Sequence, residues 1–173
     1  MTIHIKDHRD GFPMGNTSIV RHQDDEDQMP ISLAVLKLSK GTSETFTADT
    51  ETAYLLMSGK VDGRVGDKPF DFSRGSLFDE SASCLHVAAG TEVVLNCSED
   101  TEFTIYACDN LKGFEARVFN PSDVANEPRG KGQVGDRCLR YVRTIFDGTN
   151  SDPNALLVLG EVITSSPGPT PRQ

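Results

Sequence analysis

The sequence lacks three features on which whole classes of protein depend: tryptophan, long apolar runs and an excess of basic residues. Its 173 residues include no Trp, and 17 Lys and Arg are outnumbered by 26 Asp and Glu, which gives a formal charge of -9. Nucleic acids and anionic membranes attract basic patches, so this balance predicts neither partner. No stretch approaches the roughly 20 apolar residues of a membrane-spanning helix, and the N-terminal residues contain no signal-peptide core. We therefore expect a cytoplasmic protein.

Cysteine is scarce, and its spacing argues against two common uses. The sequence contains Cys84, Cys97, Cys108 and Cys138, far apart and with no Cys-x-x-Cys pair that would suit a zinc ion or redox chemistry. Three of them lie inside apolar runs. We expect buried, reduced thiols.

Sustained helical periodicity is also missing, because short apolar runs separated by turn residues follow one another from Ile31 onward. Dividers such as Ser58-Gly59 and Ser73-Arg74-Gly75 consist of residues that tolerate turn dihedrals. Many short strands at this spacing are typical of an antiparallel sandwich or barrel. The predicted strands are Ile31 to Leu38, Thr52 to Met57, Lys60 to Val65, Phe70 to Phe72, Ser76 to Phe78, Cys84 to Val87, Thr91 to Cys97, Phe103 to Cys108, Phe114 to Phe119, Cys138 to Phe146 and Ala155 to Ile163.

The rest of the chain differs in composition from this strand block. The N-terminal region is polar and ends in the acidic run Asp24 to Asp27, which we interpret as a solvated loop rather than a metal site. The C-terminal residues contain little that forms a sheet or a helix. The expected division is a polar, irregular arm (1–30), a degenerate barrel (31–119), a connector rich in Gly, Pro and charge (120–137), two strands that begin a second barrel or pack on the first (138–164) and a disordered tail (165–173).

The strand block resembles a small jelly-roll barrel of the cupin kind. In cupins a glycine precedes a His-x-His pair and a glutamate, and a second motif supplies a third histidine. At the matching positions this sequence has Thr47 and Asp49, then Ala53 or Tyr54, and later Val93. A divalent transition metal prefers about three imidazoles and a carboxylate, which these side chains do not supply. The resemblance therefore predicts an all-β, cupin-like jelly-roll barrel of antiparallel strands that binds no metal.

Histidine is rare, with four residues in the whole chain. His4, His8 and His22 lie in the arm. His4 and His8 have the spacing of a helical metal pair, but a polar arm with Pro13 close behind argues against a metal role. His86 lies in an apolar run, where packing or a single hydrogen bond is the favoured interpretation and catalysis is the alternative.

A longer pattern resembles one family. The connector Arg129-Gly130-Lys131-Gly132 is followed by Arg137, by Arg140-Tyr141-Val142-Arg143 and by the strand Leu156 to Thr164. Together with the segment Gly59 to Asn96, this arrangement is similar to that of the 5-deoxy-glucuronate isomerases of inositol catabolism. The similarity covers nearly the whole chain.

The resemblance implies a bicupin, with two barrels in one chain, that converts the aldose 5-deoxy-glucuronate into 2-deoxy-5-keto-gluconate. Such an isomerisation needs a base and an electrophile, and in the family a divalent metal lies in the second barrel on a His-x-His, Glu and His set. Where the family continues with Trp-Ser-Ser-Tyr-Pro-Pro-His, this sequence has Ser165-Ser166-Pro167-Gly168. We therefore expect the first barrel and the opening strand of the second, with no cofactor and no assigned catalytic residue in this chain.

The part of the family pattern that carries over is a group of basic residues in an otherwise acidic protein. Because a guanidinium fork suits the carboxylate of a sugar acid, we predict that this group binds substrate. Its members are Arg129, Lys131, Arg137, Arg140 and Arg143. The alternative is that each pairs with an acidic neighbour such as Glu127 or Asp136, or holds two barrels together.

Three functions remain open at this point. The first is a short member of the isomerase family that acts with a partner supplying the metal barrel. The second is a metal-free cupin that binds a small molecule, with polar contacts from Tyr54, Arg64, Asp79 or His86. The third is a structural half whose apolar strand, Ala155 to Ile163, leaves an open edge, for which we predict a homo-oligomer.

Overall fold

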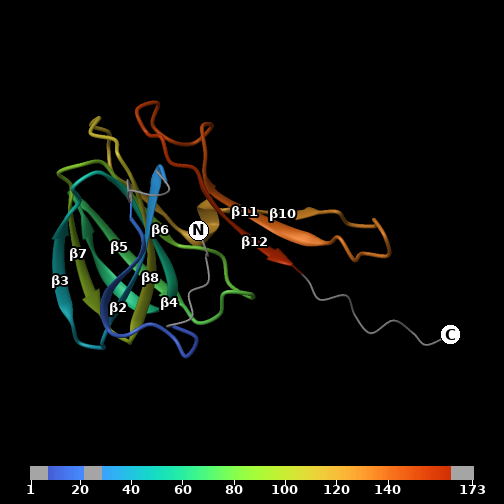
Figure 1. Ribbon diagram of the computed structural model, residues 1–173, viewed down its shortest axis with the longest axis horizontal. Helices are drawn as coiled ribbons and strands as arrows, with labels where there is room; N and C mark the ends of the chain where they lie inside the picture. The colour runs from blue at the N-terminus through green and yellow to red at the C-terminus, as the bar shows by residue number, and fades with distance from the viewer. Residues whose placement is uncertain (1–7, 22–28, 165–173) are drawn as a thin grey trace.

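The protein is an antiparallel β-barrel from which a smaller sheet projects. A computed structural model describes residues 8–21 and 29–164. Figure 1 shows the barrel on the left and the second sheet extending to the right. The barrel strands are β1 (Gly15–Val20), β2 (Ile31–Leu38), β3 (Ser43–Thr47), β4 (Glu51–Val65), β5 (Lys68–Arg74), β6 (Cys84–Val87), β7 (Glu92–Cys97), β8 (Thr101–Cys108) and β9 (Arg117–Phe119). This architecture confirms the predicted fold class of an all-β barrel of antiparallel strands.

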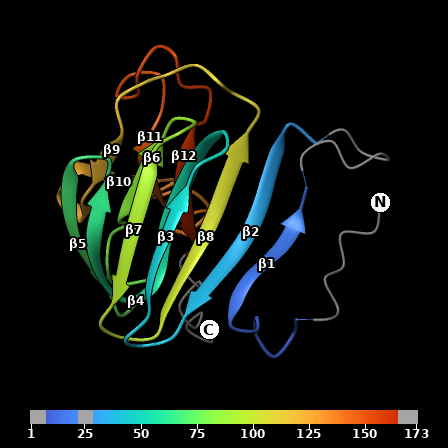
Figure 2. The same cartoon turned by 90° about the vertical axis from the view of Figure 1, so that its left-hand side faces the viewer.

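Two sheets make up the barrel, and they share one long strand. The first half of β4 pairs with β6 and β8, and β8 continues the sheet through β2 to β1, whereas the second half of β4 pairs with β5 and β7. Figure 2 shows β1 and β2 at one edge of this arrangement. β3 completes the second sheet by pairing with β7.

The strand β4 bends at Gly59, where it passes from one sheet to the other. Gly59 has a φ of 104°, and a Cβ atom there would lie 2.4 Å from the carbonyl oxygen of Asp100. The predicted turn at Ser58-Gly59, between strands Thr52 to Met57 and Lys60 to Val65, is therefore wrong. A glycine with positive φ serves a bend within one strand as well as a turn between two strands.

Alternation along the strands creates two apolar layers, one inside the barrel and one outside it. Tyr54 and Leu56 on β4 point inward with Leu85 and Val87 on β6, and they belong to the barrel core. Side chains of the other parity point outward and belong to a second core, which contains Ala53, Leu55, Cys84, Cys108, Phe119, Ile145, Phe146, Leu157 and Leu159. The outer face of this sheet is therefore buried by a further layer of chain.

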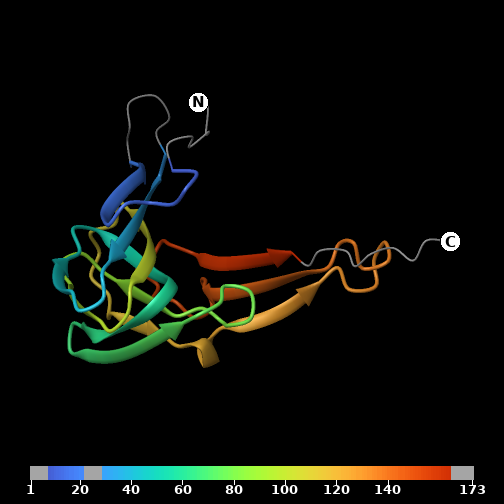
Figure 3. The ribbon, with the colours of Figure 1, turned by 90° about the horizontal axis from the view of Figure 1, so that it is seen from below.

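That further layer comes from the C-terminal part of the chain. After a short 3-10 helix (Pro121–Asp123), the strands β10 (Ala125–Arg129), β11 (Arg140–Phe146) and β12 (Leu159–Thr164) form an antiparallel sheet in this order. Seen from below in Figure 3, these strands extend away from the barrel. We call them the projecting sheet.

The two edges of the projecting sheet differ in their protection. β10 carries Pro128 between the charged residues Glu127 and Arg129, and both proline and charge discourage pairing with another strand. β12 pairs only with β11 among the described strands, and its Val162 is 61% exposed. The open edge on which the predicted homo-oligomer depends is present, and the oligomer itself stays a prediction.

Three of the predicted strands need correction. Ser76 to Phe78 is a turn, in which Ser76 Oγ donates a 2.7 Å hydrogen bond to Asp79. Ala155 to Ile163 becomes a strand only from Leu159, because N–H groups before that residue bond to a buried side chain of the barrel. Phe114 to Phe119 likewise shortens to β9.

Three strands were not predicted from the sequence. β1 lies in the arm, so the prediction of an irregular arm is wrong for residues 15–20, and β10 lies in the predicted connector. β3 is the third. His4, His22, the acidic run Asp24 to Asp27 and the predicted tail lie outside the described residues.

All four cysteines lie in the described part of the chain. Cys84, Cys97 and Cys108 are buried, Cys138 is exposed, and all four are free thiols. Across residues 8–21 and 29–164, no helix has the length and apolar character needed to span a membrane.

Candidate functional site

A pocket of about 220 Å³ lies at one end of the barrel, where the ends of β3 and β8 meet the loop before β4. We call it the barrel-mouth pocket. Its polar side chains are Asn16, Thr47, Asp49, Thr50, Thr52 and Tyr54, and its apolar ones are Leu36, Phe46, Ala48, Ile105 and Ala107. Three of the positions matched to cupin metal ligands therefore share one cavity.

These positions do not form a site for a transition metal. Val93 is fully buried in the barrel core, and Ala53 points to the outer face, where it packs in the second core. Thr47, Asp49 and Tyr54 offer two hydroxyls and one carboxylate, whereas a divalent transition metal here prefers imidazole nitrogens. In the described part of the chain, no three His, Cys, Asp or Glu side chains gather to hold a metal. The donor set of this barrel does not fit the divalent metal of the family.

Several polar groups in the pocket have no hydrogen-bond partner among the described residues. They include the Tyr54 hydroxyl, the Asp49 carboxylate and the Thr47 hydroxyl. Tyr54 is 5% exposed, and burial together with the charge of Asp49 raises the pKa of its hydroxyl to about 12. The hydroxyl therefore stays protonated at neutral pH and remains a donor. Thr47 and Asp49 are exposed, so water supplies the partners of these groups until a ligand with hydrogen-bonding groups replaces it.

The other side chains predicted to contact a ligand lie elsewhere. Of the four, only Tyr54 lines the barrel-mouth pocket. Arg64 forms an exposed ion pair with Glu92, and Asp79 lies in the exposed turn after β5. His86 lies on the outward face of β6.

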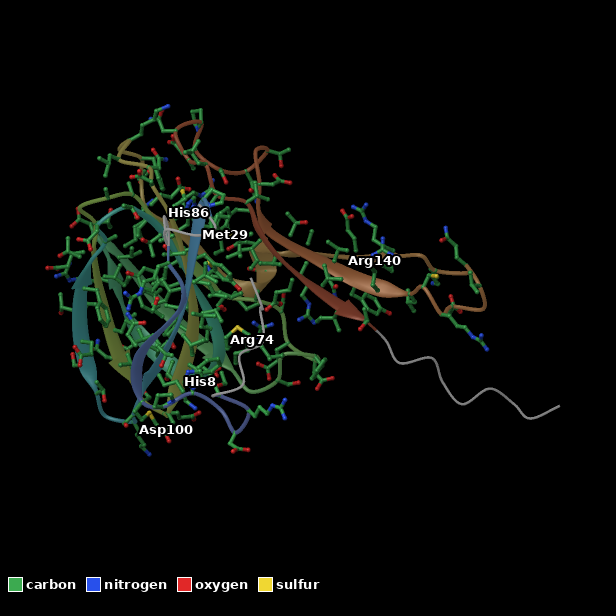
Figure 4. All side chains as sticks on the ribbon, in the orientation of Figure 1. His8, Met29, Arg74, His86, Asp100 and Arg140 are labelled. Carbon is green, nitrogen blue, oxygen red and sulfur yellow. The ribbon has the colours of Figure 1, made fainter. Side chains whose placement is uncertain are left out.

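The predicted substrate-binding residues divide into an exposed group and one buried residue. Arg129 and Arg140 lie opposite each other on β10 and β11, and Lys131 and Arg137 lie in the loop between these strands, all four exposed. Figure 4 shows Arg140 on the projecting sheet, away from the barrel. Arg129 pairs with Glu127 at 2.7 Å. The four exposed residues are thus grouped at one end of the projecting sheet, apart from the barrel-mouth pocket.

Arg143 is the buried member, and it fastens the projecting sheet to the barrel. Its guanidinium donates to three backbone carbonyl groups in the 77–80 turn at 2.7 to 2.9 Å, and Glu161 Oε2 lies 3.5 Å from it. Arg74 of β5 holds the same Glu161 carboxylate through two bonds of 2.7 and 2.8 Å. These contacts connect the projecting sheet to the barrel, and the predicted role of Arg143 in holding two barrels together stays a prediction.

A second buried connection, which the sequence analysis does not single out, centres on Glu51. Its Oε1 atom lies 2.8 Å from His86 Nε2 and 2.9 Å from the Leu157 nitrogen. Its Oε2 atom lies 2.7 Å from Asn110 Nδ2 and 2.9 Å from the Leu156 nitrogen. Burial raises the pKa of Glu51, but these bonds outweigh it and hold the pKa below the ordinary 4.5. The ionised carboxylate therefore joins the barrel to the segment that precedes β12.

His86 completes this connection through packing. Its ring stacks on Phe146, with 4.1 Å between centroids, and lies 4.9 Å from the Phe114 ring. Burial lowers the pKa of His86 against the opposing attraction of Glu51, and its Nδ1 atom has no hydrogen-bond partner among the described residues. The prediction was that His86 packs or makes a single hydrogen bond, and the structure shows both.

Comparison with known proteins adds a family and a set of similar folds. The model of the KduI/IolB family matches residues 5–169. An IolB-like protein from Salmonella typhimurium LT2 has a TM-score of 0.66 and 22% identity, over 78% of this chain and 51% of its own. A protein from Photorhabdus luminescens has a TM-score of 0.47 and 16% identity over 63% of this chain and 89% of its own. A cupin superfamily protein from Desulfitobacterium hafniense DCB-2 has a TM-score of 0.41 and 14% identity, over 55% of this chain and 78% of its own.

A search among curated proteins found no match. The chain shares its fold with the IolB-like protein and spans about half of that protein's length, 51%.

Proposed function

Because the chain belongs to the KduI/IolB family, we propose that it takes part in the sugar isomerisation that its sequence resembles, from 5-deoxy-glucuronate to 2-deoxy-5-keto-gluconate. Its described barrel acts beside a second, metal-binding barrel and does not itself carry out the proton transfer. We place this function in the cytoplasm, with a sugar acid as the small-molecule partner.

The observation that supports this division of labour is the donor set at the barrel mouth. Moving a proton between neighbouring carbons needs a base and an electrophile that stabilises the developing oxygen charge. Val93 and Ala53 supply no donor, and Thr47 and Tyr54 supply neutral hydroxyls. Asp49 supplies a carboxylate, but no Lys, Arg or His among the described lining residues stands beside it as an electrophile. We therefore assign no catalytic residue in this barrel.

The proposed contribution of this chain to substrate binding is the exposed basic group of the projecting sheet. Arg129 and Arg140 are cross-strand neighbours, and Lys131 and Arg137 follow in the adjoining loop. Two guanidinium groups on adjacent strands are suited to the carboxylate of a sugar acid. Arg129 would exchange its exposed partner Glu127 for the ligand, at little cost because exposed ion pairs are weak.

Turnover of 5-deoxy-glucuronate by the purified chain, followed by NMR of the sugar with and without added manganese or zinc, tests the proposal. We expect no product from this chain alone with either metal. Product that forms when metal is added contradicts the assignment of proton transfer to other residues.

Binding of the same sugar acid tests the basic group separately. The double variant R129Q/R140Q is expected to bind it several-fold more weakly, whereas R64Q, which removes an exposed and ion-paired arginine of the barrel, leaves affinity unchanged. Equal affinity of the double variant and the unmodified chain contradicts this role of the projecting sheet.

A second function, a metal-free module that binds a small molecule, is favoured by the unpartnered polar groups of the barrel-mouth pocket. A ligand that binds only the folded chain raises its melting temperature as the ligand concentration rises. We expect such a shift in the presence of EDTA, because the donor set needs no metal. The absence of any shift across a panel of sugars, sugar acids and polyols contradicts this function.

A further inference from the structure

The charge of the barrel-mouth pocket sets which ligands it accepts. None of its described lining residues is Lys, Arg or His, and its only carboxylate is Asp49. The remaining polar groups are the hydroxyls of three threonines and Tyr54 and the amide of Asn16. An anionic ligand would therefore meet a like charge and find no cation to balance it.

Polar and apolar groups are both present, as binding of a carbohydrate requires. Leu36, Phe46 and Ile105 provide apolar surface for C–H groups. Asp49 has no hydrogen-bond partner among the described residues and accepts hydroxyl protons, and the hydroxyl of Tyr54, whose ring is buried, donates. The volume of about 220 Å³ is below the roughly 300–1,000 Å³ of pockets that hold drug-sized ligands. The pocket is thus sized for a small molecule with several hydroxyls.

We propose that the barrel-mouth pocket binds a neutral polyhydroxylated ligand without a metal ion and discriminates against sugar acids through Asp49. This rests on the second function above, the small-molecule binding module. The sugar acid of the isomerisation then belongs to the basic residues of the projecting sheet, and the pocket of this barrel takes a different, uncharged molecule.

A lone ammonium ligand fits the pocket less well. An ammonium group would pair with Asp49 and leave the other polar groups of the pocket to water. Asn16 and Thr47 are exposed and would keep water as their partner around a single charged nitrogen. A ligand with hydroxyls on several carbons satisfies these groups together.

Two sugars that differ in one group test the proposal: D-glucose, and D-glucuronate, which has a carboxylate in place of the terminal alcohol. Binding to the full chain is measured by ligand-observed NMR in EDTA at low salt. Because R129Q/R140Q removes the second anion site, that variant is used for the comparison. We expect glucose to bind about tenfold more tightly than glucuronate, the ratio given by like charges several ångströms apart at a protein surface.

Three variants in that background assign the discrimination to the pocket. Asp49→Asn is expected to bring the two affinities within about twofold of each other, and Tyr54→Phe to weaken glucose binding while keeping the preference for the neutral sugar. Glu99→Gln makes the same charge change in the exposed turn between β7 and β8 and is expected to leave both affinities unchanged.

Each other outcome overturns the proposal in a recognisable way. Glucuronate binding as tightly as glucose, or a preference that persists in Asp49→Asn, refutes the role of Asp49. Binding of neither sugar refutes the neutral-ligand assignment. If only a sugar acid raises the melting temperature, the chain is still a binding module, but the proposed class of neutral ligands is refuted.

Discussion

Replacing Glu51 with glutamine is expected to destabilise the chain by about 2–4 kcal/mol, although the side chain keeps its size. The carboxylate accepts bonds from His86, Asn110, Leu156 and Leu157. An amide has one oxygen and one NH₂ group, so one of its two ends no longer accepts protons. The variant therefore tests whether the ionised carboxylate, rather than the bulk of the side chain, stabilises this buried site.

The magnitude follows from the least costly arrangement of the amide. Its NH₂ group faces His86, whose Nδ1 atom is unpartnered among the described residues, so the ring changes tautomer and Nε2 accepts. The Leu157 N–H is then left without its acceptor, at a cost of about 1–3 kcal/mol. The bonds from Asn110 and Leu156 weaken by about 1 kcal/mol each, since they are no longer charge-assisted. Relief from burying a charge offsets part of this sum.

Urea unfolding followed by far-UV circular dichroism measures the effect, because the chain has no Trp to report by fluorescence. With a urea dependence of about 2 kcal/mol per molar, the midpoint falls by about 1–2 M. Glu127→Gln is the matched control: its carboxylate forms an exposed pair with Arg129, and such pairs contribute about 0–1 kcal/mol. A Glu51→Gln chain as stable as this control refutes the assigned role.

Three further outcomes follow from the same contacts. Burial holds the pKa of His86 below its ordinary 6.5, so the unfolded chain takes up this proton first as the pH drops below 6.5. The free energy of unfolding then falls by up to about 1.4 kcal/mol per pH unit. Urea midpoints at pH 7.5 and 5.5 measure this fall, and the His86→Gln variant should lose it. Arg143→Lys, which cannot reproduce the fork to the 77–80 turn, should cost about 2–4 kcal/mol in the same assay, whereas Arg140→Lys on the exposed surface stays within about 0.5 kcal/mol. Val162→Lys should convert the predicted homo-oligomer to a monomer of 18.8 kDa in sedimentation, and an unmodified chain that is already monomeric at high concentration contradicts the open edge as an oligomer contact.

Apolar runs bounded by turn residues were sufficient to predict strands whose two ends are marked by such residues in the sequence. Ile31 to Leu38 and Cys84 to Val87 match β2 and β6 residue for residue. Gly59 misled because a glycine with positive φ is equally suited to a turn and to a bend, and only the pairing of β4 with two sheets distinguishes them. The short polar strand β3 carries too weak an alternation to be recognised alone.

The part of the candidate site that comes from one short sequence motif could be predicted. Thr47, Asp49 and Tyr54 meet in one pocket, as the cupin pattern predicts. Asn16 was not predictable, because it comes from β1 in the arm. Arg143 was identified as a basic residue of interest, but no local pattern could distinguish a buried clamp from an exposed carboxylate ligand.

Glu51 did carry one overlooked signal. It has the same strand parity as Ala53 and Leu55, so a carboxylate stands on an otherwise apolar outer face. Such a face predicts a covering layer, and a buried acid within it predicts hydrogen-bond donors in that layer. Nothing in the local sequence, however, identifies those donors as the N–H groups of Leu156 and Leu157.

The bonds from Glu51 to these two residues span 105 and 106 positions in the chain, and this separation bears on the order of folding. Contacts between distant segments close large loops and form late. Until the last part of the chain has emerged, the outer face of β4 and β6 is exposed to water, and Glu51 lacks the N–H groups of Leu156 and Leu157. A ribosome-bound chain that has emerged only through β9 therefore presents an unfinished apolar surface of the kind that chaperones recognise. This apolar surface is covered once the segment before β12 packs against the barrel.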